Sequence, residues 1–298
     1  MIDFLKYRYI CALFSVVVFA TFIGTYVYKR STRGYAFNYS VDFTGGSQIL
    51  LKFASDVSDA QLKDILENKG WNNPVIRKFS QTETAVRLPV SEDETTDVKD
   101  LGEKVQEVIT AALPESKPEV LAVDSVSGGL GAALRWQSLR AVLIALILML
   151  LYIGWRFWSL SFGAGAVVAL FHDAIVILTV FLLLDKEISI NVIGAILAVL
   201  GYSVNDTIVI FAQIRDALKK SSKAISIEQI VNQSLNQTLR RTVLTSVSTA
   251  LVVLSLIALG GETLRDLSLA LLVGIIFGTY SSIYIASPVM LMLYKEKR

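Results

Sequence analysis

Charge, histidine and cysteine are all scarce in this chain of 298 residues. Only 18% of the residues are charged, against 53% that are hydrophobic, and the mean hydropathy is +0.56. Such a shortage of charge does not fit an ordinary soluble domain and indicates a membrane protein. The single cysteine, Cys11, excludes an intrachain disulfide and a metal cluster held by thiolates.

The sequence also lacks the motifs that would indicate an enzyme. It contains no P-loop, no nucleophile accompanied by a base and no cluster of metal-ligand residues. We therefore expect no catalytic residue, no cofactor and no bound metal. The stretch 35–134 carries more acidic than basic residues, which argues against nucleic acid as a partner.

Six apolar stretches approach or exceed the ~20 residues that a membrane-spanning helix needs. They cover residues 10–28, 139–157, 160–184, 188–214, 242–259 and 267–294. Lys6 and Arg8 precede the first stretch, which is too long for the apolar part of a usual signal peptide and lacks a clear cleavage site. We interpret it as an uncleaved signal anchor, so the sequence predicts a polytopic α-helical bundle of six transmembrane helices.

The distribution of these stretches predicts three parts. The cytoplasmic N-terminus and first transmembrane helix occupy 1–34, and an extracytoplasmic (periplasmic) α+β domain occupies 35–134. Transmembrane helices two to six occupy 135–298, with a basic cytoplasmic loop at 215–241. Lysine and arginine gather in that loop and near both ends of the chain, which places both termini in the cytoplasm. Lys29, Arg30 and Arg33 are exceptions to this rule, because they fall on the opposite side.

The pattern of 35–134 predicts a mixture of strands and helices. Strand-like runs at 35–43 and 47–53 are separated by Gly45 and Gly46, which indicate a turn or bulge. A helix is expected at 58–70, short strands at 74–80 and 84–90, a second helix at 95–113 and a last strand at 118–126. The order β-α-β-β-α-β is that of the ferredoxin-like arrangement.

A carboxylate lies inside the fourth apolar stretch. Asp206 is ~7–8 Å from the middle of this span by helical rise, and a charge there costs at least ~2.5–3.5 kcal/mol, which predicts a function. Arg240 and Arg241 stand at the start of the next span and are the expected partners of Asp206, because an arginine side chain can reach into the membrane. Ser203 is within about one turn of Asp206 and is expected to hydrogen-bond it.

Further polar residues lie in the neighbouring spans. His172 and Asp173 are at the centre of the third span, and we expect them to extend a polar path from Asp206. Small and hydroxyl residues mark three helix faces: Gly194, Ala198, Gly201 and Asn205; Thr242, Thr245, Ser246 and Thr249; and Gly274, Gly278, Thr279, Ser281 and Ser282. Such faces are typical of close helix packing, which would also carry Asn205 inward.

Two interpretations of Asp206 and its arginine partner are open at this point. A static ion pair would only fix the packing of the helices. Alternatively, burial favours the neutral acid and a nearby arginine favours the carboxylate, so the pair can take up and release a proton as its geometry changes. A proton that crosses the membrane supplies ~2.3 kcal/mol per 100 mV, enough to bias a conformational equilibrium.

Five sequence blocks resemble those of a known family. They are VDFTGGSQILLKF (41–53), SVSGGLGAALRWQSLRA (125–141), FHD (171–173), GYSVNDTIVIFAQIRD (201–216) and NQTLRRTVLTSVSTAL (236–251). In this order they resemble the SecF branch of the SecD–SecF protein-export family, over essentially the whole chain. The segment FAQIRD departs from the family's usual FDRIRE chiefly at Ala212 and Gln213.

This resemblance implies roles for particular residues. Asp206 would carry the proton, Arg241 would be its partner, and Asn205, His172 and Asp173 would complete the proton-coupling group. Supporting polar side chains would be Arg240, Thr245, Ser246 and Ser203. The block DFTGG would form the family's motif loop, which consists of Asp42, Phe43, Thr44, Gly45 and Gly46.

The resemblance also implies partners and a location. SecD and a SecF-like chain would form two halves of an RND-like permease in the bacterial inner membrane, and would use the proton-motive force to promote preprotein translocation through SecYEG. Expected partners are therefore SecD, SecYEG, the translocating preprotein and membrane lipid, with YajC and YidC as further candidates. An alternative is a non-transporting assembly subunit with a structural ion pair. A small-molecule RND exporter would need a second six-span half and a substrate pocket that this chain does not offer.

Overall fold

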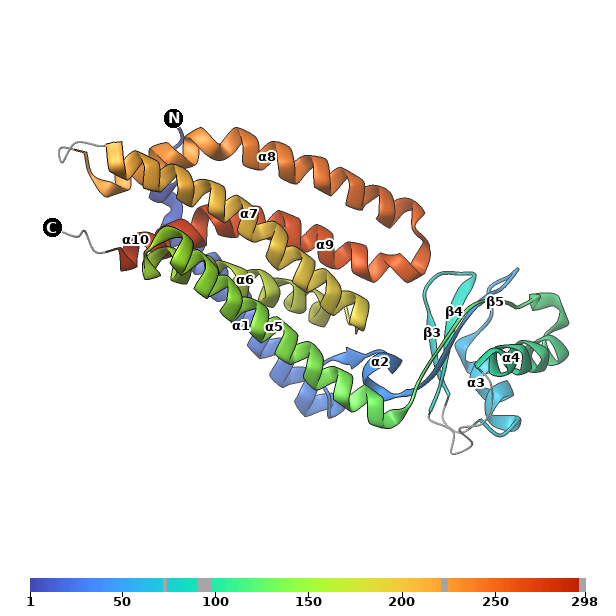
Figure 1. Ribbon diagram of the computed structural model, residues 1–298. Helices are drawn as coiled ribbons and strands as arrows, with labels where there is room; N and C mark the ends of the chain where they lie inside the picture. The colour runs from blue at the N-terminus through green and yellow to red at the C-terminus, as the bar shows by residue number, and fades with distance from the viewer. Residues whose placement is uncertain (72–73, 90–97, 221–224, 295–298) are drawn as a thin grey trace. The chain divides into compact units, whose positions relative to one another are not determined.

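The computed structural model describes residues 1–71, 74–89, 98–220 and 225–294 (Figure 1). The chain divides into two compact units, one made of Met1–Asn38 and Leu139–Arg298 and the other of Tyr39–Ser138. Residues 95–97 of the expected second helix and part of the expected loop at 215–241 lie outside the described residues.

Among the described residues, six helices are long and apolar enough to cross a membrane, which confirms the predicted number of spans. The first five are α1 (Arg8–Arg33), α5 (Gly128–Phe157), α6 (Leu160–Leu183), α7 (Ile190–Lys220) and α8 (Ile227–Leu259). The last comprises α9 (Gly261–Ser281), a π-helical turn η3 (Ser282–Ala286) and α10 (Ser287–Leu293). A 3-10 turn (Leu5–Tyr7) precedes α1, and a two-residue strand β6 (Glu187–Ile188) lies between α6 and α7.

Three of these helices form the centre of the bundle. Within the apolar windows of α6, α7 and the last span, 61%, 56% and 50% of the residues are buried, compared with 6%, 11% and 17% for α1, α5 and α8. The outer helices therefore leave most of their apolar surface to lipid or to a partner protein.

Two boundaries differ from the sequence prediction. The segment 215–241, expected as a loop, is helical over most of its length, since α7 continues to Lys220 and α8 begins at Ile227. A capping box starts α8: Gln229 N donates to Ser226 Oγ and Ser226 N donates to Gln229 Oε1, both at 3.3 Å. The helix then buries Ile230 and Leu235, which extends it ahead of the apolar stretch. Similarly, α5 begins at Gly128, well before the expected start at 139.

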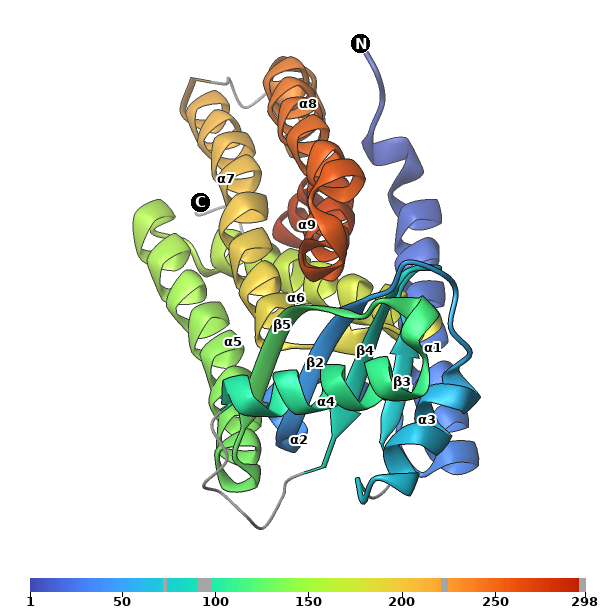
Figure 2. The same ribbon diagram turned by 90° about the vertical axis from the view of Figure 1, so that its right-hand side faces the viewer.

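The unit Tyr39–Ser138 contains a four-stranded antiparallel sheet of order β3-β4-β2-β5. Its strands are β2 (Gly46–Lys52), β3 (Val75–Lys78), β4 (Glu83–Leu88) and β5 (Glu119–Val126). Helices α3 (Asp59–Asn68) and α4 (Val98–Ala112), followed by a 3-10 turn (Pro114–Ser116), cover one face of the sheet (Figure 2). Ile49, Leu51 and Val86 of the sheet pack there against Leu62 and Ile109 of the helices. The ferredoxin-like family assignment stays a prediction.

The expected strand at 35–43 is wrong over most of its length. Only β1 (Asn38–Tyr39) is extended, and the chain then forms a single helical turn, α2 (Val41–Thr44). The turn is closed by backbone hydrogen bonds from Thr44 N to Ser40 O at 3.2 Å and from Gly45 N to Val41 O at 2.8 Å, and it buries Val41 and Phe43. Gly45 and Gly46 then take φ values of 76° and 108°, so the predicted break at this pair is confirmed.

Ion pairs explain two of the three basic residues that broke the charge rule at the end of α1. Lys29 Nζ lies 2.5 Å from Asp185 Oδ1 and donates to Leu182 O, and Arg33 Nη1 lies 3.0 Å from Asp185 Oδ2. The hydrogen bond from Lys29 lowers the pKa of Asp185, Arg33 lowers it further, and burial opposes both. These side chains therefore fix α1 to the connection between α6 and α7.

Candidate functional site

The central helices approach closely because α9 presents glycines to α7. A Cβ atom built on Gly274 would lie 2.2 Å from the Val199 side chain, and one on Gly278 would lie 3.0 Å from Ser203 Cβ. Val199 and Ser203 are four residues apart on α7, as the two glycines are on α9. The Gly274-x-x-x-Gly278 face is thus a close helix–helix contact, and it brings polar groups of the two helices together.

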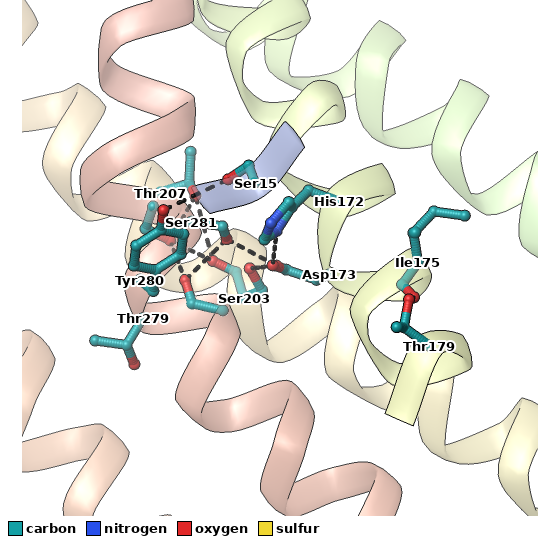
Figure 3. Close-up of polar contacts among 12 residues, drawn as sticks. Ser15, His172, Asp173, Ile175, Thr179, Ser203, Thr207, Thr279, Tyr280 and Ser281 are labelled. Atoms are coloured by element: carbon teal, nitrogen blue, oxygen red, sulfur yellow. Dashed lines mark hydrogen bonds and ion pairs between the residues drawn. The ribbon is translucent and has the colours of Figure 1, made fainter. Parts of the chain in front are cut away.

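Asp173 of α6 is the most enclosed carboxylate of this site, with 0% of its surface exposed. Its Oδ2 accepts hydrogen bonds from Ser203 Oγ of α7 at 2.6 Å and from Ser281 Oγ of α9 at 2.9 Å (Figure 3). Its Oδ1 lies 3.3 Å from Nδ1 of His172. Within the described part of the chain, Asp173 forms no ion pair with a lysine or arginine. A single carboxylate therefore ties three helices together through two hydroxyls, and it also contacts the imidazole of its neighbour on α6.

Additional hydroxyls of the last span contact the neighbouring helices. Thr207 Oγ1 of α7 lies 2.9 Å from Ser282 Oγ, and Ser246 Oγ of α8 lies 2.6 Å from Thr279 Oγ1. Residues 279, 281 and 282 thus face α8, α6 and α7 in turn. The last span thereby connects the polar groups of all three neighbouring helices.

A π-helical turn follows directly after these hydroxyls. It covers Ser282–Ala286, and Pro288 stands just beyond it, where its ring cannot donate a backbone hydrogen bond. Ser287 Oγ donates to Ser282 O at 3.1 Å, which satisfies one carbonyl of the irregular turn. Turns of this type inside α-helices occur frequently at functional sites.

Asp206 is held in a different way. It is 3% exposed, and among the described residues its Oδ2 has no hydrogen-bond partner. Ser246 of α8 is its hydroxyl neighbour, and the guanidinium of Arg241 acts on it electrostatically. No ion pair of 4 Å or less joins Asp206 to Arg241 in the part of the chain that the structure describes.

The predicted contact between Asp206 and Arg241 is therefore not formed in this structure. Thr242 and Ser246 face the bundle, at 1% and 8% exposure, whereas Arg241 is exposed. One residue along a helix corresponds to a rotation of ~100°, so Arg241 is turned away from the side that Thr242 presents. Arg240 is exposed as well.

Several other predicted residues lie elsewhere than expected. Ser203 donates to Asp173 and not to Asp206, because the side of α7 that carries it faces α6 and α9. Thr245 Oγ1 donates to carbonyls of its own helix, at Arg241 and Thr242. Asn205 is exposed.

The small-residue face predicted for α7 is not used within this chain. Gly194, Ala198, Gly201 and Asn205 are all exposed, and a Cβ atom on Gly194 or Gly201 would meet nothing within 4 Å. α7 instead packs through the opposite side, which carries Val199 and Ser203. The small residues consequently form an open strip along one of the central helices.

The roles of Ser281 and Thr207 were missed by the sequence analysis. Ser281 was grouped with packing hydroxyls and Thr207 was not singled out. The signal that could have found Ser281 is its spacing from Gly278, since a residue one turn from a close-contact glycine faces the same helix interface.

At the departure from the family pattern, Gln213 Nε2 donates to Gln237 Oε1 at 2.6 Å, so an amide pair joins α7 to α8 there.

The DFTGG residues form a compact turn inside the unit Tyr39–Ser138. Asp42, Phe43 and Thr44 belong to α2, and Phe43 is 2% exposed. Arg135 Nη2 donates to Phe43 O at 3.0 Å, and a Cβ atom on Gly131 would lie 2.9 Å from Gly45 N. The motif loop is therefore clamped against the start of α5. Nearby, burial raises the pKa of Asp124 and the charge of Asp42 raises it further.

The fold and these contacts define a class: a polytopic α-helical membrane protein with ionisable side chains enclosed between its central helices. The chain belongs to the SecD/SecF family of protein-export membrane proteins. The family model "Protein export membrane protein SecD/SecF, C-terminal" matches residues 105–296, and the model "SecD/SecF GG Motif" matches residues 35–57.

Individual relatives agree with this assignment. The chain is 37% identical over 288 residues to the protein translocase subunit SecF of Desulfurispirillum indicum, covering 96% of this chain and 90% of that protein. It is 39% identical over 270 residues to the protein translocase subunit SecDF of Thermus thermophilus, covering 88% of this chain and 35% of that longer protein. The crystal structure of SecDF from that organism, described as a translocon-associated membrane protein, superposes with a TM-score of 0.84 at 36% identity, covering 98% of this chain and 38% of that one. Together with the six apolar helices, these relatives identify a multi-pass protein of the bacterial inner membrane.

Proposed function

We propose that this chain is a SecF-type subunit of the Sec protein-export machinery, which works with SecD and uses the proton-motive force to promote preprotein translocation through SecYEG. The similarity to SecF and SecDF translocase subunits supports the export role. The observation that carries the coupling role is Asp206, a carboxylate enclosed in a spanning helix with one oxygen left without a partner in the described residues.

The incomplete partnership of Asp206 favours coupling over a static ion pair. A structural pair should be in contact, since a buried charge left without its partner is strongly destabilising. Asp206 and Arg241 are instead apart, with a hydroxyl beside the carboxylate. A carboxylate in this setting is neutral when protonated and needs Arg241 when ionised, so proton release would draw the two helices into a different arrangement. His172 and Asp173 provide a second ionisable pair deeper in the same bundle.

The open strip of α7 is the surface at which SecD would dock. Gly194, Ala198 and Gly201 allow the backbone of another helix to approach closely, as α9 does on the opposite side. Arg241 of the adjacent α8 is exposed as well. The fused SecDF relative, of which this chain matches 35%, is consistent with a second half of that kind.

The remaining assignments follow from the same proposal. Both termini lie in the cytoplasm, and the domain at 35–134 lies on the periplasmic side, where it would contact the translocating preprotein. Its motif loop at 42–46, fixed to the start of α5, would connect that domain to the second span. YajC and YidC stay predicted partners.

The proposal is tested with Asp206→Asn, which keeps the shape of the side chain and removes its charge. We expect the variant to copurify normally with SecD while preprotein export falls to the level without a proton-motive force. Asp216→Asn is the matched control, since Asp216 is exposed near the end of the same helix. Unchanged export by Asp206→Asn at matched complex levels would refute the coupling role.

A further inference from the structure

A cavity of about 490 Å³ lies beside the buried Asp173 pair. It is bounded by α1, α6, the η3–α10 segment and the first turn of α8. Ten of its sixteen lining residues are apolar, and the polar ones are Arg8, Tyr9, Ser15, His172, Glu228 and Tyr284. All of these belong to the unit that holds the spans, and the cavity is distinct from the surroundings of Asp206.

His172 stands between this cavity and Asp173. The side chain is 1% exposed, and its Nδ1 lies 3.3 Å from Asp173 Oδ1. Among the described residues Nε2 has no hydrogen-bond partner, although it is buried. His172 lines the cavity, and its two ring nitrogens point in different directions, so Nδ1 faces Asp173 while Nε2 lies on the other edge of the ring and is itself buried. A buried polar atom without a partner requires an explanation, such as a water molecule.

The polar groups of the cavity extend from the end of the span toward its middle. Arg8 and Glu228 lie at one end, where the backbone of Phe4 donates to Asn232 of α8. The His172 ring packs beside Phe19, 6.0 Å between centroids. From Arg8 to Phe19, α1 rises ~16 Å, about half the thickness of a hydrocarbon core. Since one water occupies roughly 30 Å³, the cavity has room for a chain of waters over this depth.

We propose that the cavity is a water-filled entrance through which protons reach His172 and, from it, Asp173. This inference rests on the proposed function, in that it gives the proton of the coupling mechanism a route into the bundle. A hydronium ion in the cavity gives its proton to Nε2 and becomes water. The imidazole passes the proton on Nδ1 to Asp173 Oδ1, so the carboxylate becomes the neutral acid and the ring ends neutral in its other tautomer.

The other titratable groups around His172 do not offer the same route. On α9, Tyr280 donates its hydroxyl hydrogen to Cys11 O of α1 at 2.8 Å. Tyr284, Tyr9, Arg8 and Glu228 line the cavity nearer its other end, and Asp206 of α7 faces α8. His172 is thus the cavity-lining group in direct contact with the buried carboxylate.

The route is tested by thiol accessibility in the full complex, reconstituted in vesicles. Cys11→Ala removes the natural thiol, and Ser15→Cys then places one inside the cavity, with Leu13→Cys as the control on the exposed side of α1. A membrane-impermeant methanethiosulfonate reagent needs a hydrated thiolate. We expect Ser15→Cys to react at least tenfold faster, although it lies deeper in the span. Equal rates, or an inert Ser15→Cys, would show a cavity filled by lipid and overturn the route.

Proton flux distinguishes this inference from the proposed function. His172→Gln and the cavity-filling Ser15→Phe should each lower flux at least tenfold, while Leu13→Phe should leave it unchanged. Full proton flux in both cavity variants would overturn the proposed entrance. If Asp206→Asn abolishes flux in the same assay, the coupling proposal still stands. Full flux in Asp206→Asn would instead refute the coupling role, whatever the accessibility of Ser15→Cys.

Discussion

At the scale of the residue, the bundle encloses two carboxylates in unlike surroundings. Asp173 accepts two hydroxyl hydrogen bonds and contacts an imidazole, whereas Asp206 keeps one oxygen without a partner in the described residues. A fully partnered buried group mainly fixes structure, while a partly satisfied one is free to change its partners. Asp173 therefore connects α6, α7 and α9 and would exchange a proton only with His172, whereas Asp206 keeps an oxygen that can take a new partner as the helices move.

The hydroxyl of Ser281 should therefore contribute to stability. Ser281→Ala removes a donor from a buried carboxylate, and we expect a loss of about 1 kcal/mol, the upper part of the range for hydrogen bonds between spanning helices. Ser255→Ala is the control, since Ser255 is exposed and donates only to Val252 of its own helix. Thermal unfolding of the two purified variants in detergent measures the difference. Equal melting temperatures would contradict the role given to Ser281.

A second residue-scale prediction concerns pH. The pKa of Asp185 is lowered in the folded protein by Lys29 and Arg33, so its carboxylate stabilises the fold above the unfolded pKa of ~3.9, and this contribution is lost as the pH falls through the folded value. We expect Asp185→Asn to unfold at a lower temperature than the wild type at about pH 7, and the difference to shrink as the pH falls below ~3.9. A difference that persists in acid would mean that the effect is not electrostatic.

At the scale of the element, the contact between α7 and α9 depends on two glycines. Gly274→Ala would place a methyl group 2.2 Å from Val199, so the helices must move apart. We expect a loss of about 1–3 kcal/mol, as for overpacked cores, and recovery of part of it in the double variant with Val199→Ala, which removes the two nearest atoms. Gly201→Ala is the control, because nothing lies within 4 Å of its added atom. Unfolding measurements that rank Gly201→Ala as equally harmful would contradict this packing.

Which elements form could be read from the sequence, but which of their faces meet could not. Apolar length alone identified the six spans, and Gly274 and Gly278 had a packing pattern that the structure uses. The same kind of pattern at Gly194, Ala198 and Gly201 gave the wrong face of α7, because small residues indicate close approach without saying whether the approaching helix belongs to the same chain. The sequence analysis paired Ser203 with Asp206, the carboxylate nearer to it in the sequence. In the structure α6 packs against α7, and Ser203 donates to Asp173 of α6.

At the scale of the whole molecule, the bundle has an open side along a central helix. α7 is 56% buried over its apolar window, yet its strip of small residues and Asn205 is exposed, next to the exposed Arg241 of α8. A polar and a charged side chain on the outside of spanning helices are costly against lipid. The strip is accordingly the surface that the proposed SecD half would cover.

Docking at this strip predicts a separation between folding and assembly. Gly201→Leu should leave the melting temperature of the isolated chain unchanged, because no described atom lies within 4 Å of a Cβ added at Gly201, but should lower copurification with SecD by at least tenfold. Leu148→Phe, on the exposed surface of α5, is the control for a bulkier residue at another lipid-facing position. Normal copurification of Gly201→Leu would place the interface elsewhere.

The most direct test of the central claim is the proton flux that accompanies export, measured in vesicles that contain the complete complex. Wild type and Asp206→Asn are compared at matched amounts of assembled complex, with preprotein export and proton movement recorded in the same sample. The account predicts that the variant assembles normally and loses both flux and proton-driven export. Wild-type flux and export in the variant would contradict the claim that the carboxylate of α7 couples the two.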